Sequence, residues 1–132
     1  MSPVVPHFEL SEQTAVSGTH VISVRGEIHL STAPRLSQRL QAAIDDDSRA
    51  IVLDLSAVEF IDSTGLSVLL SGLRRMNQVQ GRMALVCANP TVLRLFEITS
   101  LDETFDIFAE LPAAVAHVQG KGDAGGSSGG AP

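Results

Sequence analysis

The sequence predicts an α/β fold, with a mixed sheet of four to five strands and about four α-helices packed against it. Short runs rich in β-branched residues alternate with stretches of helical periodicity, which indicates crossover connections that place helices on a sheet. The run AIVLDL at residues 50–55 is almost wholly apolar, as is typical of a central parallel strand buried on both faces. The length of 132 residues indicates one domain that is large enough to bury a core.

The N-terminal part predicts a hairpin followed by a helix. Residues 7–12 and 20–26 alternate between polar and apolar residues, and residues 17–18 between them have turn chemistry. The helix begins after Ser31 or Thr32, either of which is able to cap it. Its apolar positions recur at helical spacing and are Leu36, Leu40, Ala43 and Ile44.

The central part predicts a strand, a turn and a second helix. The strand at residues 50–55 leads to the turn FIDSTG at residues 60–65. The helix after this turn is terminated by Gly81. Its apolar positions are Leu66, Leu69, Leu70 and Leu73.

The last third predicts two further strand and helix pairs. A strand at residues 83–87 is followed by Asn89 and Pro90, which favour the cap and the first position of a short helix. A short strand is expected at residues 104–107 and a final helix at residues 112–118.

The chain is expected to consist of one domain at residues 7–119 between two flexible ends. Residues 1–6 are predicted to be flexible. Residues 120–132 hold six of the 11 glycines, and such a Gly/Ser-rich composition predicts a disordered tail.

Composition argues against several classes of function. A net charge of −6 with no Trp or Tyr disfavours nucleic-acid binding. No segment reaches the about 18 apolar residues of a membrane span, and Cys87 is the single cysteine, so a cytoplasmic protein is expected. The histidines lack the spacing of metal ligands, and neither a metal nor a cofactor is predicted.

The stretch FIDSTGL at residues 60–66 is the candidate site. It follows the carboxyl end of the most buried strand and opens a helix, where sites form in α/β sheets. On one interpretation, Asp62 or Ser63 only caps the helix. On the other, the Ser63 hydroxyl faces solvent and carries a phosphate that the helix N-terminus tolerates.

FIDSTGL resembles the phosphoacceptor loop of the STAS domains of bacterial anti-sigma factor antagonists, in which the regulatory serine directly follows an aspartate. The resemblance extends over about residues 8–118. It is also carried by GEI at residues 26–28, TAP at 32–34, the strand at 51–55, residues 81–86, Pro90, Leu95 with Phe96, and residues 101–105. The motifs are weak singly and specific in this order and spacing.

The resemblance implies a binding module that takes part in a partner switch and is not an enzyme. The unphosphorylated protein would bind an anti-sigma factor of the histidine-kinase-like ATPase fold and so free a sigma factor. That partner would phosphorylate Ser63, and a PP2C-type phosphatase would restore it. The protein is expected to be a monomer or a weak dimer. The expected partner-binding residues are Glu27, His29, Asp62, Ser63, Thr64, Gly65, Ser67 and Ser71.

One position departs from the family pattern, and two other functions stay open. Where family members commonly have aspartate after Gly-Glu-Leu, this chain has His29, which removes a negative charge near the phosphoacceptor. His29 therefore keeps open a constitutive adaptor or ligand-binding module without a phosphorylation cycle. A hydrolase with Ser63 as nucleophile and His29 and Asp62 as partners is the other alternative, although the Gly-x-Ser-x-Gly elbow is missing.

Overall fold

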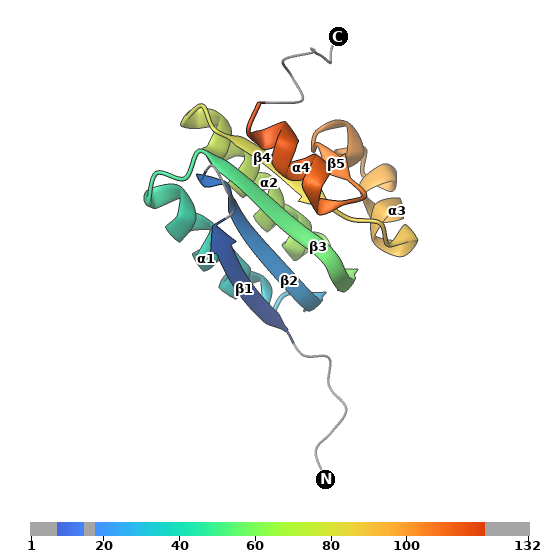
Figure 1. Cartoon of the computed structure of the whole chain (residues 1–132). Coiled ribbons are helices and arrows are strands. Elements are labelled where there is room, and N and C mark those ends of the chain that lie inside the picture. The colour runs from blue at the N-terminus through green and yellow to red at the C-terminus, as the bar shows by residue number, and fades with distance from the viewer. Residues whose placement is uncertain (1–7, 15–17, 121–132) are drawn as a thin grey trace.

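The computed structural model describes residues 8–14 and 18–120. Five strands form one sheet in the order β1-β2-β3-β4-β5, and β1 is antiparallel to β2 while the other neighbours are parallel (Figure 1). The strands are β1 (Glu9–Thr14), β2 (His20–Ile28), β3 (Ala50–Ile61), β4 (Arg82–Val86) and β5 (Ile107–Phe108). The predicted antiparallel pair of N-terminal strands and the mixed sheet are confirmed. Residue 17 of the predicted turn and the predictions for residues 1–6 and 121–132 lie outside the described residues.

Helices cover both faces of this sheet (Figure 1). The helices are α1 (Ala33–Asp45), α2 (Ser63–Gln78), α3 (Pro90–Ile98) and α4 (Leu111–Val118), and the 3-10 turn η2 (Leu101–Glu103) precedes β5. The first three pack in the larger apolar cluster with one face of the sheet, and α4 packs in a smaller cluster on the other face. Since β3 lies in the middle, its residues Ile51 and Val52 are buried on opposite faces, as its sequence predicts.

Helices α1 and α2 approach each other closely on the larger face. A Cβ added to Gly72 of α2 would lie 2.2 Å from Cδ2 of Leu40 on α1. Leu40 and Gly72 are both buried, so the absence of a side chain at Gly72 allows the two helices to pack together. This contact fixes α2, and with it the helix N-terminus that carries the candidate site.

Strand β3 is longer than predicted, and this changes the expected turn. Only residues 50–54 of β3 pair with β4, but β3 continues beside β2 as far as the pair Ile28 and Ile61. Residues 60–61 are therefore strand, and Ser63 is already helix, so the predicted turn at residues 60–65 is wrong. Asp62 alone joins β3 to α2, and we call it the Asp62 junction.

Helix α2 does not end in the way that the sequence predicted, because Gly81 is not the residue with the left-handed conformation. Gln80, at φ 61°, has the left-handed conformation that was expected of glycine. Gly81 is instead required by space, because an added Cβ would lie 2.6 Å from Cε of Met76 and 3.0 Å from the carbonyl oxygen of Arg49. The residue thus lets the chain pass between α2 and the start of β3.

Two shorter predictions near the C-terminus are corrected or confirmed. The expected strand at residues 104–107 is displaced, since the 3-10 turn at Leu101–Glu103 comes first and β5 comprises only Ile107 and Phe108. The cap of α3 is confirmed, because the Asn89 side chain accepts a hydrogen bond from the amide of Thr91 at 2.8 Å.

Candidate functional site

The candidate site lies where β2 and β3 end side by side. Ile28 and Ile61 are paired in register, and the amide of Asp62 donates to the carbonyl oxygen of Ile28 at 3.1 Å. The segments that follow these strands, one beginning with His29 and the other with Asp62, therefore leave the same edge of the sheet. This edge brings together two stretches that the sequence separates by more than 30 residues.

Gly65 holds the start of α2 against this edge. It is buried, and an added Cβ would lie 2.7 Å from Ile28 Cγ2, 2.7 Å from Ile61 Cγ1 and 3.1 Å from the Ile28 carbonyl oxygen. No side chain can be accommodated there without displacing strand residues. Gly65 was predicted to be a partner-binding residue, and its structural contribution is to position the residues before it.

Asp62 caps α2 and leaves Ser63 available. Its backbone is extended, at φ −105° and ψ −174°, and its side chain accepts a hydrogen bond from the Gly65 amide at 3.0 Å. This settles which of the two candidate residues is the cap. Ser63 is the first residue of the helix and is exposed, and Thr64 is half-buried. None of the hydrogen bonds among the described residues uses either hydroxyl.

The predicted residues farther along α2 lie on the same face as Ser63. Ser67 and Ser71 follow at intervals of four residues and are exposed, and residues four apart are neighbours on a helix surface. The structure thus provides an exposed row of three serines that begins at the helix N-terminus. Leu66 and Leu69 of the same helix are buried in the core and are not part of this exposed row.

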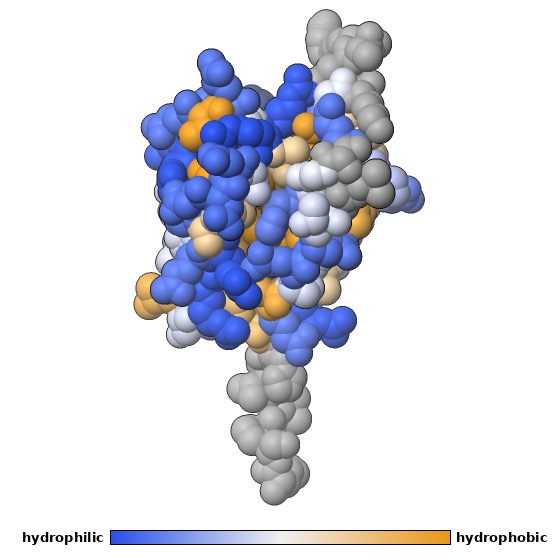
Figure 2. All heavy atoms as spheres, turned by 60° about the vertical axis from the view of Figure 1, so that its left-hand side comes forward, coloured by the Kyte–Doolittle hydropathy of each residue, from blue (hydrophilic) through white to orange (hydrophobic). Residues whose placement is uncertain are grey.

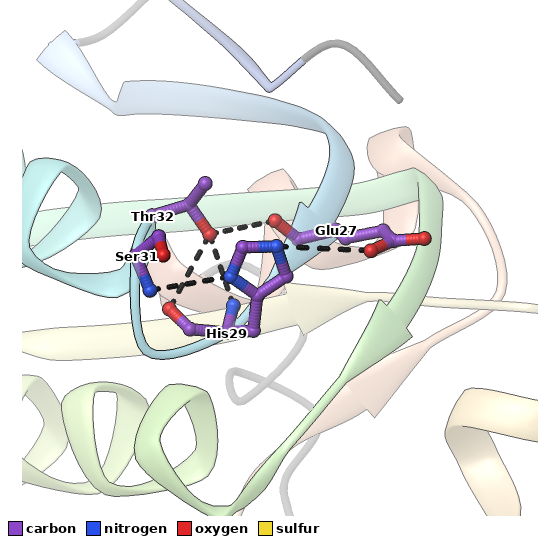
Figure 3. Close-up of polar contacts among 4 residues, drawn as sticks. All are labelled: Glu27, His29, Ser31 and Thr32. Atoms are coloured by element: carbon purple, nitrogen blue, oxygen red, sulfur yellow. Dashed lines mark hydrogen bonds and ion pairs between the residues drawn. The ribbon is translucent and has the colours of Figure 1, made fainter. Parts of the chain in front are cut away.

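The last two residues of β2 and the four that follow form a compact turn over residues 27–32, which we call the 27–32 turn (Figure 3). The hydroxyl of Thr32 donates to the carbonyl oxygen of Glu27 at 2.7 Å and accepts from the amide of His29 at 2.9 Å. The amides of Thr32 and Ala33 both donate to the His29 carbonyl oxygen, at 2.9 and 2.7 Å. Thr32 occupies the N-cap position of α1 but makes no side-chain cap, so the expectation that the side chain of Ser31 or Thr32 caps this helix is wrong.

His29 is held by its own turn (Figure 3). Its Nδ1 accepts from the amide of Ser31 at 3.2 Å, and its Nε2 lies 3.7 Å from Oε1 of Glu27. An acceptor at Nδ1 places the proton of the neutral ring on Nε2, which faces the carboxylate. His29 follows β2, and Asp62 follows the neighbouring strand β3. None of the hydrogen bonds or ion pairs of the described residues nevertheless joins His29 to Asp62 or Ser63.

This arrangement gives the hydrolase alternative no support. Both nitrogens of His29 face groups within the 27–32 turn, and Oδ1 of Asp62 is used by the Gly65 amide. A nucleophilic serine needs a base within hydrogen-bond reach that is itself oriented by a third group. The pair of contacts that would activate Ser63 is not formed among the described residues.

Two exposed apolar residues at this edge were missed by the sequence analysis. Leu30, in the 27–32 turn, is 73% exposed, and Phe60, next to the last residue of β3, is 44% exposed. Ile98, at the end of α3, is the third large apolar side chain exposed among the described residues. An apolar residue between His29 and Ser31 was the available signal, but periodicity assigns no face to a loop.

Away from this edge, the described surface has a hollow of about 440 Å³ that is lined mainly by residues of β1 and β2 and by Arg35 of α1. The face shown in Figure 2 is mostly hydrophilic, with apolar residues in small separate patches. Within residues 8–14 and 18–120, no group of three His, Cys, Asp or Glu side chains is placed to hold a metal ion. In the same residues, no helix has the length and apolar character needed to cross a membrane.

The comparison with known proteins agrees with this geometry. The model of the STAS domain matches residues 11–114. The chain belongs to the STAS domain family. This STAS domain is 35% identical over 104 residues to the anti-sigma-F factor antagonist RsfB of Mycobacterium tuberculosis, covering 79% of this chain and 84% of RsfB. The resemblance inferred from FIDSTGL is thus confirmed at the level of the family.

Two further relatives extend the comparison of this STAS domain. The anti-sigma-B factor antagonist of Listeria monocytogenes is 34% identical over 86 residues, which cover 65% of this chain and 75% of that protein. The crystal structure of an anti-sigma factor antagonist from Mycobacterium paratuberculosis superposes with a TM-score of 0.78 at 34% identity, covering 86% of this chain and 95% of that one. The five-stranded mixed sheet with four helices is therefore the STAS fold.

Proposed function

We propose that this STAS domain is an anti-sigma factor antagonist that binds a kinase-type anti-sigma factor of the histidine-kinase-like ATPase fold and is released when Ser63 is phosphorylated. The relatives named above are anti-sigma factor antagonists. The observation that carries the proposal is the division of roles at the Asp62 junction. Asp62 caps α2, and the neighbouring Ser63 hydroxyl is exposed and unused.

A phosphate on Ser63 is compatible with the fold. Ser63 is the first residue of α2, where the partial positive charge of the helix N-terminus stabilises an anion by about 0.3–1 kcal/mol. The cap made by Asp62 does not depend on the Ser63 hydroxyl. Phosphorylation would therefore change the charge of the surface by about −1.5 to −2 and leave the packing of Gly65 intact.

The same charge is large enough to release a partner. A phosphate that faces one partner carboxylate at about 4 Å costs on the order of 4 kcal/mol at an effective dielectric constant near 20. Since each 1.4 kcal/mol is a factor of about ten in affinity, binding would weaken by about a thousandfold. Screening by salt that halved this energy would still leave a usable switch.

The proposal includes the partners and the surface that they use. The anti-sigma factor would contact the exposed row Ser63, Ser67 and Ser71 together with Glu27, His29, Asp62 and Thr64, and a PP2C-type phosphatase would remove the phosphate. The protein would be a cytoplasmic binding module and kinase substrate, and not an enzyme. It would act as a monomer or weak dimer.

The test is a pull-down from the native host with Ser63→Ala and Ser63→Glu as baits, followed by mass spectrometry. The alanine bait should retain a kinase-fold anti-sigma factor that the glutamate bait loses. Ser11→Glu, on the exposed strand β1, is the matched control for added charge and should retain the partner. Incubation of the purified partner with ATP should then phosphorylate the wild type and not Ser63→Ala.

His29 supports a second candidate, a constitutive adaptor without a phosphorylation cycle. The imidazole stands where the family commonly has a carboxylate, and it is engaged with Glu27 and Ser31. Equal retention of one partner by both Ser63 baits, together with no phosphorylation by that partner, would favour the adaptor over the switch.

A further inference from the structure

Leu30 is exposed, and hydrogen bonds hold the backbone on both sides of it in place. A single exposed leucine needs no explanation by itself. Leu30 differs because the residues on both sides of it are tied down: His29 bonds through its amide, carbonyl and Nδ1, and Ser31 and Thr32 donate through their amides (Figure 3). The 27–32 turn therefore holds a 73% exposed apolar side chain in a fixed place.

Such a residue has the properties of an interface anchor. Binding costs free energy for every backbone segment and side chain that becomes ordered. The backbone of a preformed turn is already ordered before binding, so this part of the cost does not arise. Anchors are apolar or aromatic side chains that enter a pocket of the partner and are surrounded by polar groups. In the 27–32 turn, the polar residues His29 and Ser31 flank Leu30 in the chain, and Glu27 faces His29.

Leu30 and Ser63 lie close enough to share one interface. Leu30 lies two positions after Ile28, Ser63 lies two positions after Ile61, and Ile28 and Ile61 are paired in the sheet. Two residues span at most about 7 Å. With neighbouring strands about 4.8 Å apart, the Cα atoms of Leu30 and Ser63 lie within roughly 19 Å. A standard interface of about 800 Å² per partner, if circular, is about 30 Å across.

We propose that Leu30 is the apolar anchor of the interface with the anti-sigma factor and inserts into an apolar pocket of that partner beside the Ser63 contact. The proposal rests on the proposed function and adds the kind of surface that the partner must present. Phe60, which is exposed at the end of β3, would extend the apolar contact.

The chemistry of the edge favours a different protein over a second copy of this chain as the occupant. In a symmetric dimer built on this edge, the same patch meets itself. The carboxylates of Glu27 and Asp62 would then face those of the second copy, and like charges in an interface oppose association. An anti-sigma factor with a pocket for Leu30 has no such conflict.

The experiment measures the Kd of the captured anti-sigma factor by calorimetry for the full-length variants Leu30→Ser, Leu30→Met, Ile98→Ser and Ser63→Glu. Leu30→Ser should weaken binding at least tenfold, or about 1.4 kcal/mol, with an unchanged Tm because the side chain is exposed. Leu30→Met keeps the apolar volume and should bind within about threefold of the wild type. Ile98→Ser removes a 66% exposed apolar side chain from the end of α3 and should leave the Kd unchanged.

The outcomes separate this proposal from the proposed function. Wild-type affinity for Leu30→Ser with weakened binding of Ser63→Glu would overturn the anchor and leave the switch standing. Loss of self-association in Leu30→Ser, detected by analytical ultracentrifugation, with unchanged partner affinity would assign Leu30 to a dimer instead. Failure of Ser63→Ala to capture any anti-sigma factor would overturn the proposed function, and the anchor with it.

Discussion

The two connections that leave the carboxyl edge of β2 and β3 use their hydroxyl groups in opposite ways. In the 27–32 turn, the Thr32 hydroxyl donates to Glu27 and accepts from His29. At the Asp62 junction, a carboxylate makes the cap and the neighbouring Ser63 hydroxyl is exposed. The comparison shows that the local hydrogen bonds, and not the residue type, decide which hydroxyl is accessible to a modifying enzyme.

The largest expected effect is on the packing that supports both connections. Gly65→Ala should lower the free energy of unfolding by about 1–3 kcal/mol, because the new Cβ would lie 2.7 Å from Ile28 and Ile61 side-chain carbons. Urea denaturation measures the loss. Ser67→Ala on the exposed face of the same helix is the control and should stay within about 0.5 kcal/mol of the wild type. Equal stability of both variants would mean that this edge is loosely packed.

Thr32→Val tests whether the 27–32 turn depends on its hydroxyl. The substitution keeps the shape of the side chain but leaves the His29 amide and the Glu27 carbonyl without their partner, at a cost of about 1–2 kcal/mol in the free energy of unfolding. Thr32→Ser retains the hydroxyl and should lose less. If serine and valine were equally destabilising in urea denaturation, the lost methyl contacts and not the two hydrogen bonds would account for the effect.

Asp62→Ala tests the other connection. Loss of the cap on the Gly65 amide should reduce the free energy of unfolding by about 1 kcal/mol, less than Thr32→Val, because a single hydrogen bond is removed. Asp62→Asn keeps an acceptor oxygen and should restore most of the stability. If Asp62→Ala lowered the free energy of unfolding more than Thr32→Val does, the Asp62 cap would contribute more to stability than the hydroxyl of the 27–32 turn, contrary to this prediction.

The smallest effect at neutral pH concerns the next connection along this edge, after β4. Burial raises the pKa of the Cys87 thiol above its ordinary value of 9.0, and a backbone hydrogen bond with Asn89 partly opposes this rise. The Cys87 thiol therefore loses its proton at a lower pH in the unfolded chain than in the folded protein. The contribution of the buried, neutral thiol to stability is complete below about pH 9 and declines as the pH rises toward the pKa of the folded state.

Urea denaturation from pH 7 to 10.5 measures this decline. The chain has no tyrosine, and its single lysine is Lys121, so few other groups titrate in this range. Cys87→Ala should be less stable at every pH but should lose the alkaline slope. A slope that persisted in Cys87→Ala would have to come from another group.

Much of the fold followed from periodicity and turn chemistry, and the failures have local causes. The helices were recognised because their buried positions, such as Leu36 and Leu40, repeat at helical spacing. The second half of β3 was missed because Ser56 and Glu59 are exposed beyond the part that pairs with β4, so this half lacks the apolar run of a doubly covered strand. A strand that is covered on both faces is recognised by its continuous apolar run, and a strand with exposed residues lacks such a run.

The candidate site was predicted in part. FIDSTGL gave the position of Ser63 and the two candidate caps, but only the three-dimensional structure distinguishes Asp62 from Ser63. The contacts of His29 and the exposure of Leu30 depend on where the Thr32 hydroxyl points. A threonine side chain can bond locally in several ways, and the choice here depends on the strand that the turn follows.

The pairing of Ile28 with Ile61 also makes the proposed recognition surface a discontinuous epitope. Leu30 and Ser63 belong to segments that are brought together only when β2 and β3 align in their native register. A nascent or misfolded chain that has not formed this long-range pairing contains both residues but does not hold them side by side. An anti-sigma factor that requires both residues in this arrangement would discriminate between the folded protein and unfolded polypeptide.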